Sequence, residues 1–254
     1  MKKAAQSSMR LPIMLVVAAA VIVVVVFGIR AIWHKPDAST PSSNKTAGVV
    51  VVIDPAHGGS DGGSTAEGVL EKNVTLAVAN KMSAMAASFP GLKLVFTRNS
   101  DTEMSDAERF AVASQQAAQL FLAIHVNAFG QPTALGIETL VDSVHKAGDA
   151  SWSFADAVQK SVVAATAAKD RGVKAQGSAF SRLTIPAAST LVGFISTPEE
   201  RAKLIDPEYQ DSIARGILQG VANYVTSAGV TPASATQTIP LDNGQTAKPA
   251  GTAP

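Results

Sequence analysis

The sequence predicts one α/β domain, in which helices cover both faces of a central sheet. Short apolar runs that suit buried strands alternate along the chain with amphipathic segments that suit helices. The alternation extends over residues 49–228 and shows no internal repeat. This length suits a single domain of ordinary size.

Strands are predicted where apolar residues follow one another without interruption. The first, Val49–Asp54, reads VVVVID and is typical of a strand that is buried on both faces. Leu120–Val126 is a second such run, broken only by its His, and strands are also predicted at Lys93–Arg98 and Gly136–Ser143.

Helices are predicted where apolar residues recur every three to four positions, as Val74, Val78 and Met82 do. Ser105 and Glu108 have the spacing of a capping box, which marks the start of the second helix. The third helix is expected to stop near Gly172. The predicted helices are Glu71–Ser88, Ser105–Ala117, Trp152–Lys169 and Glu208–Ala228.

The N-terminal segment differs in composition from this domain. Basic residues precede the apolar run Leu11–Ile29, which as a helix is long enough to cross a bilayer core. We therefore predict a transmembrane signal anchor at residues 11–33, with residues 1–10 in the cytoplasm and the main domain outside it, in the periplasm or cell wall. A cleaved signal peptide is the alternative interpretation.

Two further segments are too polar to form a core. Residues 34–48 are rich in Pro, Ser and Thr and are predicted to be a linker. Residues 229–254, with their Pro, Thr, Ala and Gln content, are predicted to be a disordered tail.

The overall composition limits the chemistry that the domain can perform. The net charge is only +1, from 21 basic and 20 acidic residues, so nucleic acid is not an expected partner. Cysteine is absent, which excludes disulfides, thiolate zinc sites and thiol catalysis. A metal site in this chain must use His, Asp and Glu.

Two histidines stand where predicted strands end. His57 comes shortly after the first strand, and His125 lies at the end of Leu120–Val126. In open α/β sheets, the carboxyl ends of the strands gather ligands and catalytic groups along one edge. His57 and His125 could therefore meet in space.

Glu71 is the third candidate, in the first turn of a predicted helix and on the same face as Val74 and Val78. The positive end of the helix alone can explain a carboxylate there. Alternatively, a buried carboxylate requires a cation or several hydrogen-bond donors. Together with His57 and His125, Glu71 would complete a set of three ligands that catalytic zinc uses.

The segment His57–Gly63, HGGSDGG, is a glycine-rich loop. A phosphate cradle is one interpretation, but the Lys-Ser/Thr pair of a P-loop is missing and the pattern is not GxGxxG. Glycine here is better explained by a sharp turn and by close approach of a substrate to the backbone.

Several motifs occur together in an order that resembles one family. They are VVIDPAHGGSDGG at Val51–Gly63, EKN at Glu71–Asn73, IHVNA at Ile124–Ala128, GIET at Gly136–Thr139 and LVGFIST at Leu191–Thr197. The chain resembles the zinc-dependent N-acetylmuramoyl-L-alanine amidases of bacterial cell-wall hydrolysis, across nearly all of residues 49–228.

The resemblance implies a single α/β domain with a central, mostly parallel sheet of about six strands. It implies Zn²⁺ held by His57, Glu71 and His125. It also implies peptidoglycan as the substrate, cut at the amide between N-acetylmuramic acid and L-alanine of the stem peptide. That substrate lies outside the cytoplasm, in agreement with the predicted anchor.

Three further residues receive roles beside the metal ligands. Asp54 is the candidate hydrogen-bond partner that orients a ligand. Arg109 could contact a carboxylate of the stem peptide, or form an ion pair within the fold. Asn127, in the IHVNA motif, is the second candidate for substrate binding.

One departure from the family pattern concerns catalysis. The family segment reads approximately P-x-x-L-V-E-x-G-F, and alignment on Pro186 and Gly193–Phe194 places Leu191 at the catalytic glutamate. Leucine cannot accept a proton, and loss of general-base help costs about 10²–10⁴-fold in rate. The substitutes that the sequence offers are Glu138, Glu67, Glu199 and Glu200, each of which suits a structural or surface role better.

Two functions therefore remain open from the sequence. The first is an active, membrane-anchored zinc amidase. The second is a catalytically impaired amidase-like domain, a pseudoenzyme, that binds peptidoglycan or a partner in a structural or regulatory role. A zinc hydrolase that acts on another amide is a third option.

Overall fold

The computed structural model describes residues 48–232. The predicted anchor at residues 11–33, nearly all of the predicted linker and most of the predicted tail lie outside these residues. Within the described part of the chain, no helix is both long and apolar enough to span a bilayer.

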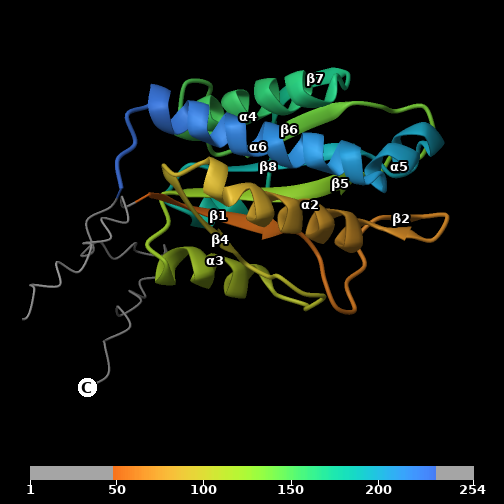
Figure 1. Ribbon diagram of the computed structural model, residues 1–254, viewed down its shortest axis with the longest axis horizontal. Coiled ribbons are helices and arrows are strands. Elements are labelled where there is room, and N and C mark those ends of the chain that lie inside the picture. Colours follow the sequence, from red (N-terminus) through yellow and green to blue (C-terminus); the bar gives the residue numbers. More distant parts are fainter. Residues whose placement is uncertain (1–47, 233–254) are drawn as a thin grey trace, which may run out of the picture. The chain divides into compact units, whose positions relative to one another are not determined.

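A six-stranded sheet forms the centre of the fold, in the order β4-β1-β5-β8-β6-β7 (Figure 1). Neighbouring strands from β4 to β8 are parallel, whereas β6 is antiparallel to β8 and parallel to β7. A small hairpin, β2–β3, stands apart from this sheet. The strands are β1 (Val49–Pro55), β2 (Thr65–Ala66), β3 (Val69–Leu70), β4 (Leu92–Phe96), β5 (Leu120–Asn127), β6 (Ile137–Asp142), β7 (Asp170–Gln176) and β8 (Ala187–Phe194).

Helices cover the sheet unequally. α2, α4 and α6 pack on one face, where the larger core includes Val78, Phe154 and Ile217. α3 packs on the other face against β1 and β5, around Phe110 and Phe121. The helices are α2 (Glu71–Met85), η1 (Ala86–Ser88), α3 (Asp106–Gln115), α4 (Ala150–Thr166), η2 (Ala179–Arg182), α5 (Pro198–Leu204) and α6 (Pro207–Ser227).

The predicted fold class is confirmed, and most predicted elements form within a few residues of their expected ends. The capping box is present, since Ser105 and Glu108 exchange hydrogen bonds at the start of α3. The third helix ends earlier than predicted, at Thr166, with Ala167 in the left-handed region (φ 51°). The strand β7 therefore begins at Asp170, close to the Gly172 where the helix was expected to stop.

On the α3 side, the half of the sheet made of β8, β6 and β7 carries little cover. The short helix η2 lies there, in contact with β6. A pocket of about 270 Å³ opens there, lined by His125, Ser189 and Leu191 from the sheet and by Ala179 and Phe180 from η2. The fold thus leaves one side of the sheet accessible next to the carboxyl end of β5.

Candidate metal centre

His57, Glu71 and His125 meet at one edge of the sheet. β1 and β5 are parallel neighbours, so the residues that follow β1 and those that end β5 lie at the same edge. α2 begins there with Glu71. One ligand atom from each of the three residues lies within 4.8 Å of the other two. The structure therefore brings together the three residues that the sequence singled out.

Glu71 forms the centre of this group. Its side chain is only 2% exposed, and its Oε1 lies 3.2 Å from His57 Nε2 and 3.0 Å from His125 Nδ1. The backbone N–H groups of Ser64 and Val126 each donate to the carboxylate at 2.8 Å. Burial raises the pKa of Glu71, but the hydrogen bonds with His125 and His57 outweigh it and hold that pKa far below its usual value.

This arrangement tests whether a metal fits the three side chains. A carboxylate that stays charged while buried, beside two imidazole nitrogens, offers the nitrogen and oxygen donors that zinc binds. The nearby backbone also leaves room for the ligands. A Cβ on Gly63 would lie 2.6 Å from His57 Cδ2 and 2.8 Å from Glu71 Oε2. The absence of a side chain at Gly63 thus leaves the space that His57 and Glu71 occupy. The donor set of the three side chains fits zinc.

The glycine-rich loop makes a sharp turn, as its composition predicts. His57 itself has φ 64°, and Gly58 and Gly59 follow with φ 136° and 60°. The loop amides are taken by protein acceptors, since Gly58 N donates to Asp61 O and Gly59 N to Asp101 Oδ1. Ser60 N also donates to Glu103. These contacts stabilise the turn at His57. Because these loop N–H groups already donate to protein oxygens, the structure does not support a phosphate-binding loop.

The ring of His57 is oriented by Asp61 rather than by Asp54. His57 Nδ1 and Asp61 Oδ2 lie 2.8 Å apart, so Nε2 is the nitrogen that faces Glu71. A carboxylate on the far ring nitrogen fixes the tautomer and orientation of a metal-binding histidine. The sequence did not indicate Asp61, because a spacing of four residues on a loop predicts no contact.

Zinc affinity is expected to fall as the pH is lowered through the pKa of His57. The hydrogen bond with Glu71 raises this pKa above 6.5 despite the opposing effect of burial. The protonated ring stabilises the metal-free fold below pH 6.5, and this stabilisation is lost as the pH rises through the raised pKa. The proton must leave His57 before a metal binds. As the pH is lowered, zinc affinity should therefore begin to fall while the pH is still above 6.5.

Chelator competition from about pH 5.5 to about pH 8.5 measures this dependence. The matched variant is Asp61→Asn, because Asp61 also raises the pKa of His57. In that variant the fall in affinity should move to lower pH. Affinity that is constant between about pH 6 and about pH 8 would contradict the expectation.

Asp54 and Arg109 belong to one buried ion pair. Arg109 Nη1 lies 2.6 Å from Asp54 Oδ1, and both side chains are almost fully buried. Thr97 Oγ1 donates to the same Asp54 oxygen at 2.5 Å. Arg109 also donates to the backbone oxygen of His57 at 2.9 Å. Of the two roles considered for Arg109, the structure places it in the ion pair within the fold, with no exposed guanidinium for a substrate.

Replacing Arg109 with lysine is expected to destabilise the fold by about 2 kcal/mol. Lysine keeps the charge, but it cannot reproduce the guanidinium contacts to Met104 O, Asp54 and His57 O at the same time. Urea denaturation measures the change. Arg215→Lys, at an exposed position of α6, is the control and should change stability by less than about 0.5 kcal/mol. If Arg109→Lys leaves stability unchanged but weakens substrate binding, Arg109 is a substrate-binding residue instead.

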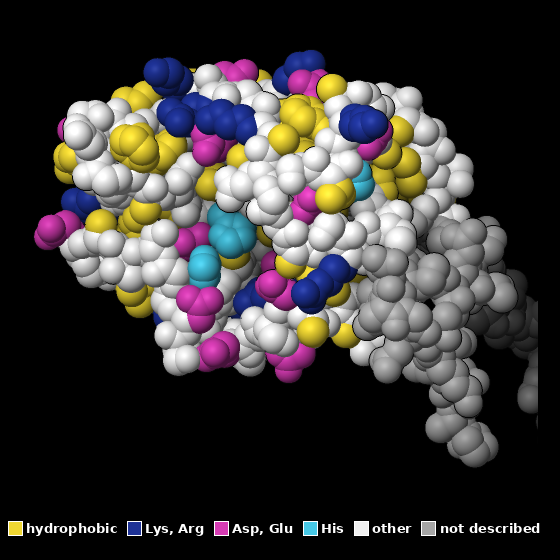
Figure 2. Space-filling view, turned by 180° about the vertical axis from the view of Figure 1, so that it is seen from behind, with side chains coloured by type: hydrophobic (Ala, Val, Ile, Leu, Met, Phe, Trp, Pro, Cys, Tyr) yellow, Lys and Arg dark blue, Asp and Glu magenta, His cyan; other side chains and the backbone are white. Residues whose placement is uncertain are grey.

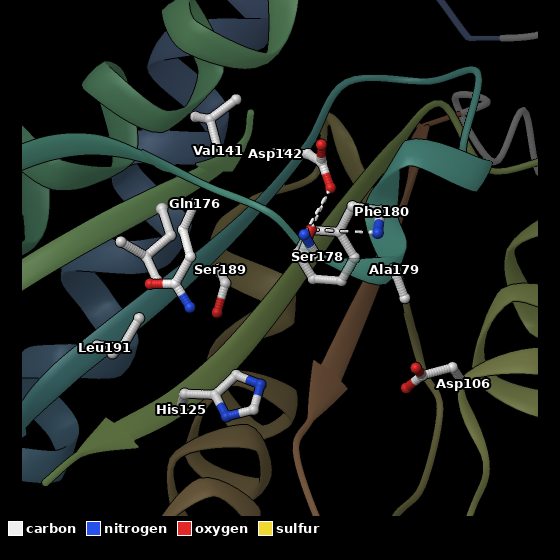
Figure 3. Close-up of a pocket in the computed structure, with 11 residues that line it drawn as sticks. Asp106, His125, Val141, Asp142, Gln176, Ser178, Ala179, Phe180, Ser189 and Leu191 are labelled. Carbon is white, nitrogen blue, oxygen red and sulfur yellow. Dashed lines mark hydrogen bonds between the residues drawn. The ribbon is translucent and has the colours of Figure 1, made fainter. Parts of the chain in front are cut away.

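Leu191 lies in the middle of the accessible sheet face, between His125 and Glu138. It pairs with His125 of β5 on one side and with Glu138 of β6 on the other. Figure 3 shows Leu191, Ser189 and His125 along this face, and across the pocket the hydrogen-bonded pair Asp142–Ser178. Leu191, which the sequence pattern predicts at the position of a catalytic glutamate, thus lines the pocket beside a candidate metal ligand.

Glu138 is poorly suited to act as a general base. Its carboxylate accepts hydrogen bonds from Arg171 Nε, Lys174 Nζ and Asn127 Nδ2. Burial raises its pKa, but the hydrogen bonds from Arg171 and Lys174 outweigh it and lower the pKa below its usual value. Asn127, a candidate for substrate binding, has its side-chain amide engaged in this contact.

The other candidate carboxylates lie elsewhere. Glu67 is an exposed residue at the turn between β2 and β3, with φ 48°. Glu200 is buried and accepts hydrogen bonds from the backbone N–H groups of Gly136 and Phe194. Glu199 is exposed in the first turn of α5. None of them lines the pocket beside His125.

A buried glutamate and two histidines at the strand ends of an α/β sheet, beside an open pocket, define a candidate metal-dependent hydrolase. The profile of the N-acetylmuramoyl-L-alanine amidase family matches residues 51–223. The chain belongs to this family, whose members typically depend on zinc.

Curated relatives and solved structures agree with this assignment. The N-acetylmuramoyl-L-alanine amidase LytC of Bacillus subtilis is 31% identical over 76% of this chain, which spans 40% of LytC. The protein YqiI of the same species is 35% identical, over 74% of this chain and 88% of YqiI. The crystal structure of an N-acetylmuramoyl-L-alanine amidase from Clostridium difficile is 34% identical over 71% of this chain and 98% of that one, with a TM-score of 0.68.

Proposed function

We propose that the protein is a zinc-dependent peptidoglycan hydrolase that cleaves the amide between N-acetylmuramic acid and L-alanine of the stem peptide. The observation that supports this proposal is the convergence of His57, Glu71 and His125, because His125 also lines the pocket on the open sheet face. Membership of the amidase family and relatives that are named for this reaction support it.

His57, Glu71 and His125 are the residues that would hold zinc. When bound, zinc polarises a carbonyl and lowers the pKa of a bound water to about 7. Asp61 keeps the ring of His57 oriented, and the backbone N–H groups of Ser64 and Val126 keep Glu71 in place. Leu191 contributes no proton acceptor, so we expect slow cleavage from this chain.

We further propose that residues 11–33 anchor the protein in the cell membrane as a single span. The apolar run Leu11–Ile29 and the basic residues before it support this proposal. Peptidoglycan lies outside the cytoplasm, so this topology would place the amidase domain beside its substrate. Alkaline extraction of membranes tests the anchor, and release of the full-length chain into the soluble fraction would overturn it.

The proposed reaction is tested by incubating the full-length chain, purified in detergent and loaded with zinc, with isolated sacculi. Free stem peptides with an L-alanine amino terminus are the expected product, because only cleavage of the lactyl amide creates that terminus. His125→Ala should release none. Lys160→Met, on the exposed side of α4, serves as a folded control and should match the unaltered chain.

We retain the binding role as the second candidate, because the sequence pattern predicts Leu191 at the position of the family glutamate. Sacculi that pull down the protein without any release of stem peptides would support binding alone. Release of a product with a different amino terminus would indicate a hydrolase of another amide.

A further inference from the structure

The accessible sheet face next to the pocket has a regular surface. Residues that pair across neighbouring strands point to the same face of a sheet. Pairing places His125, Leu191 and Glu138 in one row. The next row contains Ser189, Leu140 and Lys174. Each row therefore begins near the candidate metal centre or the pocket and leads across the sheet towards β7.

Two cations gather at the β7 end of these rows. Arg171 Nε lies 2.7 Å and Lys174 Nζ 2.5 Å from Glu138 Oε2. Arg171 also lies over the ring of Phe194, at 4.7 Å from its centroid, which fixes the guanidinium against the sheet. One carboxylate thus faces two cations, and the cluster keeps a net positive charge.

The cluster of Arg171, Lys174 and Glu138 is open to solvent, and its two cations have hydrogen-bond donors that Glu138 does not use. The Lys174 side chain is 45% exposed, and that of Arg171 is 28% exposed. Among the described residues, Lys174 Nζ contacts only Glu138, and Arg171 Nη2 has no hydrogen-bond acceptor. Figure 2 shows basic and acidic side chains on the same face as exposed histidine side chains.

The opposite side of the pocket has the reverse charge. Asp106 and Asp142 line it there, and Asp142 accepts hydrogen bonds from Ser178. A negatively charged group would be repelled from that side and attracted towards Arg171 and Lys174. The charge distribution therefore gives a bound peptide one preferred direction across the sheet.

We propose that Arg171 and Lys174 form a subsite for a carboxylate of the peptide whose amide lies at the candidate metal centre. This inference rests on the proposed function and assigns specificity within it. Glu138 lies two strands from His125, a separation of about 10 Å. An extended peptide advances about 3.3–3.6 Å per residue, so the carboxylate belongs to the second or third residue after the scissile amide.

The apolar residues between the two positions suit this path. Leu191 and Leu140 line the pocket between His125 and the cationic pair. These two leucines offer an apolar surface for the aliphatic part of a peptide. The subsite therefore selects acidic peptides over neutral ones.

The test compares two synthetic N-acetylmuramoyl-L-alanyl tripeptides in which the carboxyl groups of the second and third residues are either free or converted to carboxamides. A CH₂ group replaces the scissile nitrogen in both, so that neither is cut. Calorimetry with the full-length, zinc-loaded chain in detergent should show about ten-fold tighter binding of the carboxylate form. Lys174→Met should remove most of this preference, and Arg171→Gln should act in the same direction.

Lys160→Met is the matched control, because Lys160 is also an exposed lysine paired with a carboxylate, but on α4. It should leave the preference unchanged. Equal affinity for the two peptides, or a preference that survives Lys174→Met, would overturn the subsite while leaving the proposed function intact. If the unaltered chain binds neither peptide, and also releases no stem peptide from sacculi, the proposed function fails together with the subsite.

Discussion

Replacing Leu191 with glutamate is expected to increase the rate of stem-peptide release by about 10²–10⁴-fold, the usual contribution of a general base. Leu191 pairs in register with His125 and lines the same pocket. Adjacent strands are about 4.8 Å apart, so a carboxylate at this position reaches the space beside His125. There it could take a proton from the attacking water.

The substitution should also be tolerated by the fold. Leu191 is only partly buried on the open sheet face, so the new carboxylate remains in contact with solvent. Glu138 on the next strand is a like charge, but Arg171 and Lys174 already compensate it. Thermal melting of the variant should therefore stay close to that of the unaltered chain.

Leu191→Gln is the control for this experiment. Glutamine has nearly the same shape as glutamate and also ends in a polar group, but its neutral amide cannot act as a base at neutral pH. Release of stem peptides from sacculi, followed over time with equal zinc loading, gives the rates. If Leu191→Glu is no faster than Leu191→Gln, the role assigned to position 191 is wrong.

The grouping of His57, Glu71 and His125 could be predicted from the sequence because these residues lie on or next to elements with clear patterns. Val49–Asp54 and Leu120–Val126 are apolar runs, and parallel strands necessarily bring their carboxyl ends to one edge. Glu71 shares the inward face of an amphipathic helix, and it is indeed buried. Pattern alone left open whether a cation or the helix end explains this carboxylate.

The neighbours of this candidate metal centre could not be predicted in the same way. The contact of Asp61 with His57 depends on a loop that turns back on itself, which no periodicity describes. The pairing of Arg109 with Asp54 joins residues 55 positions apart. Their relative position is set by how α3 packs on β1, and that packing follows from the whole core.

Two strands of the central sheet were missed, for different reasons. β7 reads DRGVKAQ and is largely polar, because it is an edge strand with one accessible face. β8 is central and almost entirely buried, but it reads AASTLVGF, with small and hydroxylic residues in place of a β-branched apolar run. The position of Leu191 next to both His125 and Glu138 follows from β8, so its full environment required the structure.

Replacing Gly63 with alanine is expected to weaken zinc binding by at least about 100-fold. The added Cβ would lie 2.6 Å from His57 Cδ2 and 2.8 Å from Glu71 Oε2, so both ligands must move. Changes in residues that only orient a ligand already cost about 10–100-fold in metal affinity. Here the ligands themselves are displaced. Chelator competition on the full-length chain measures the loss.

Gly68→Ala separates this effect from backbone strain. Gly63 and Gly68 both have positive φ, 65° and 78°, so alanine costs about 1–2 kcal/mol of conformational energy at either position. A Cβ at Gly68 would meet no atom within 4 Å. Gly63→Ala should lose more stability than Gly68→Ala even without metal, because His57 and Glu71 must also move, and only Gly63→Ala should lose zinc. Equal zinc affinities would mean that His57 and Glu71 can shift without cost, and that they do not hold the metal in the arrangement described.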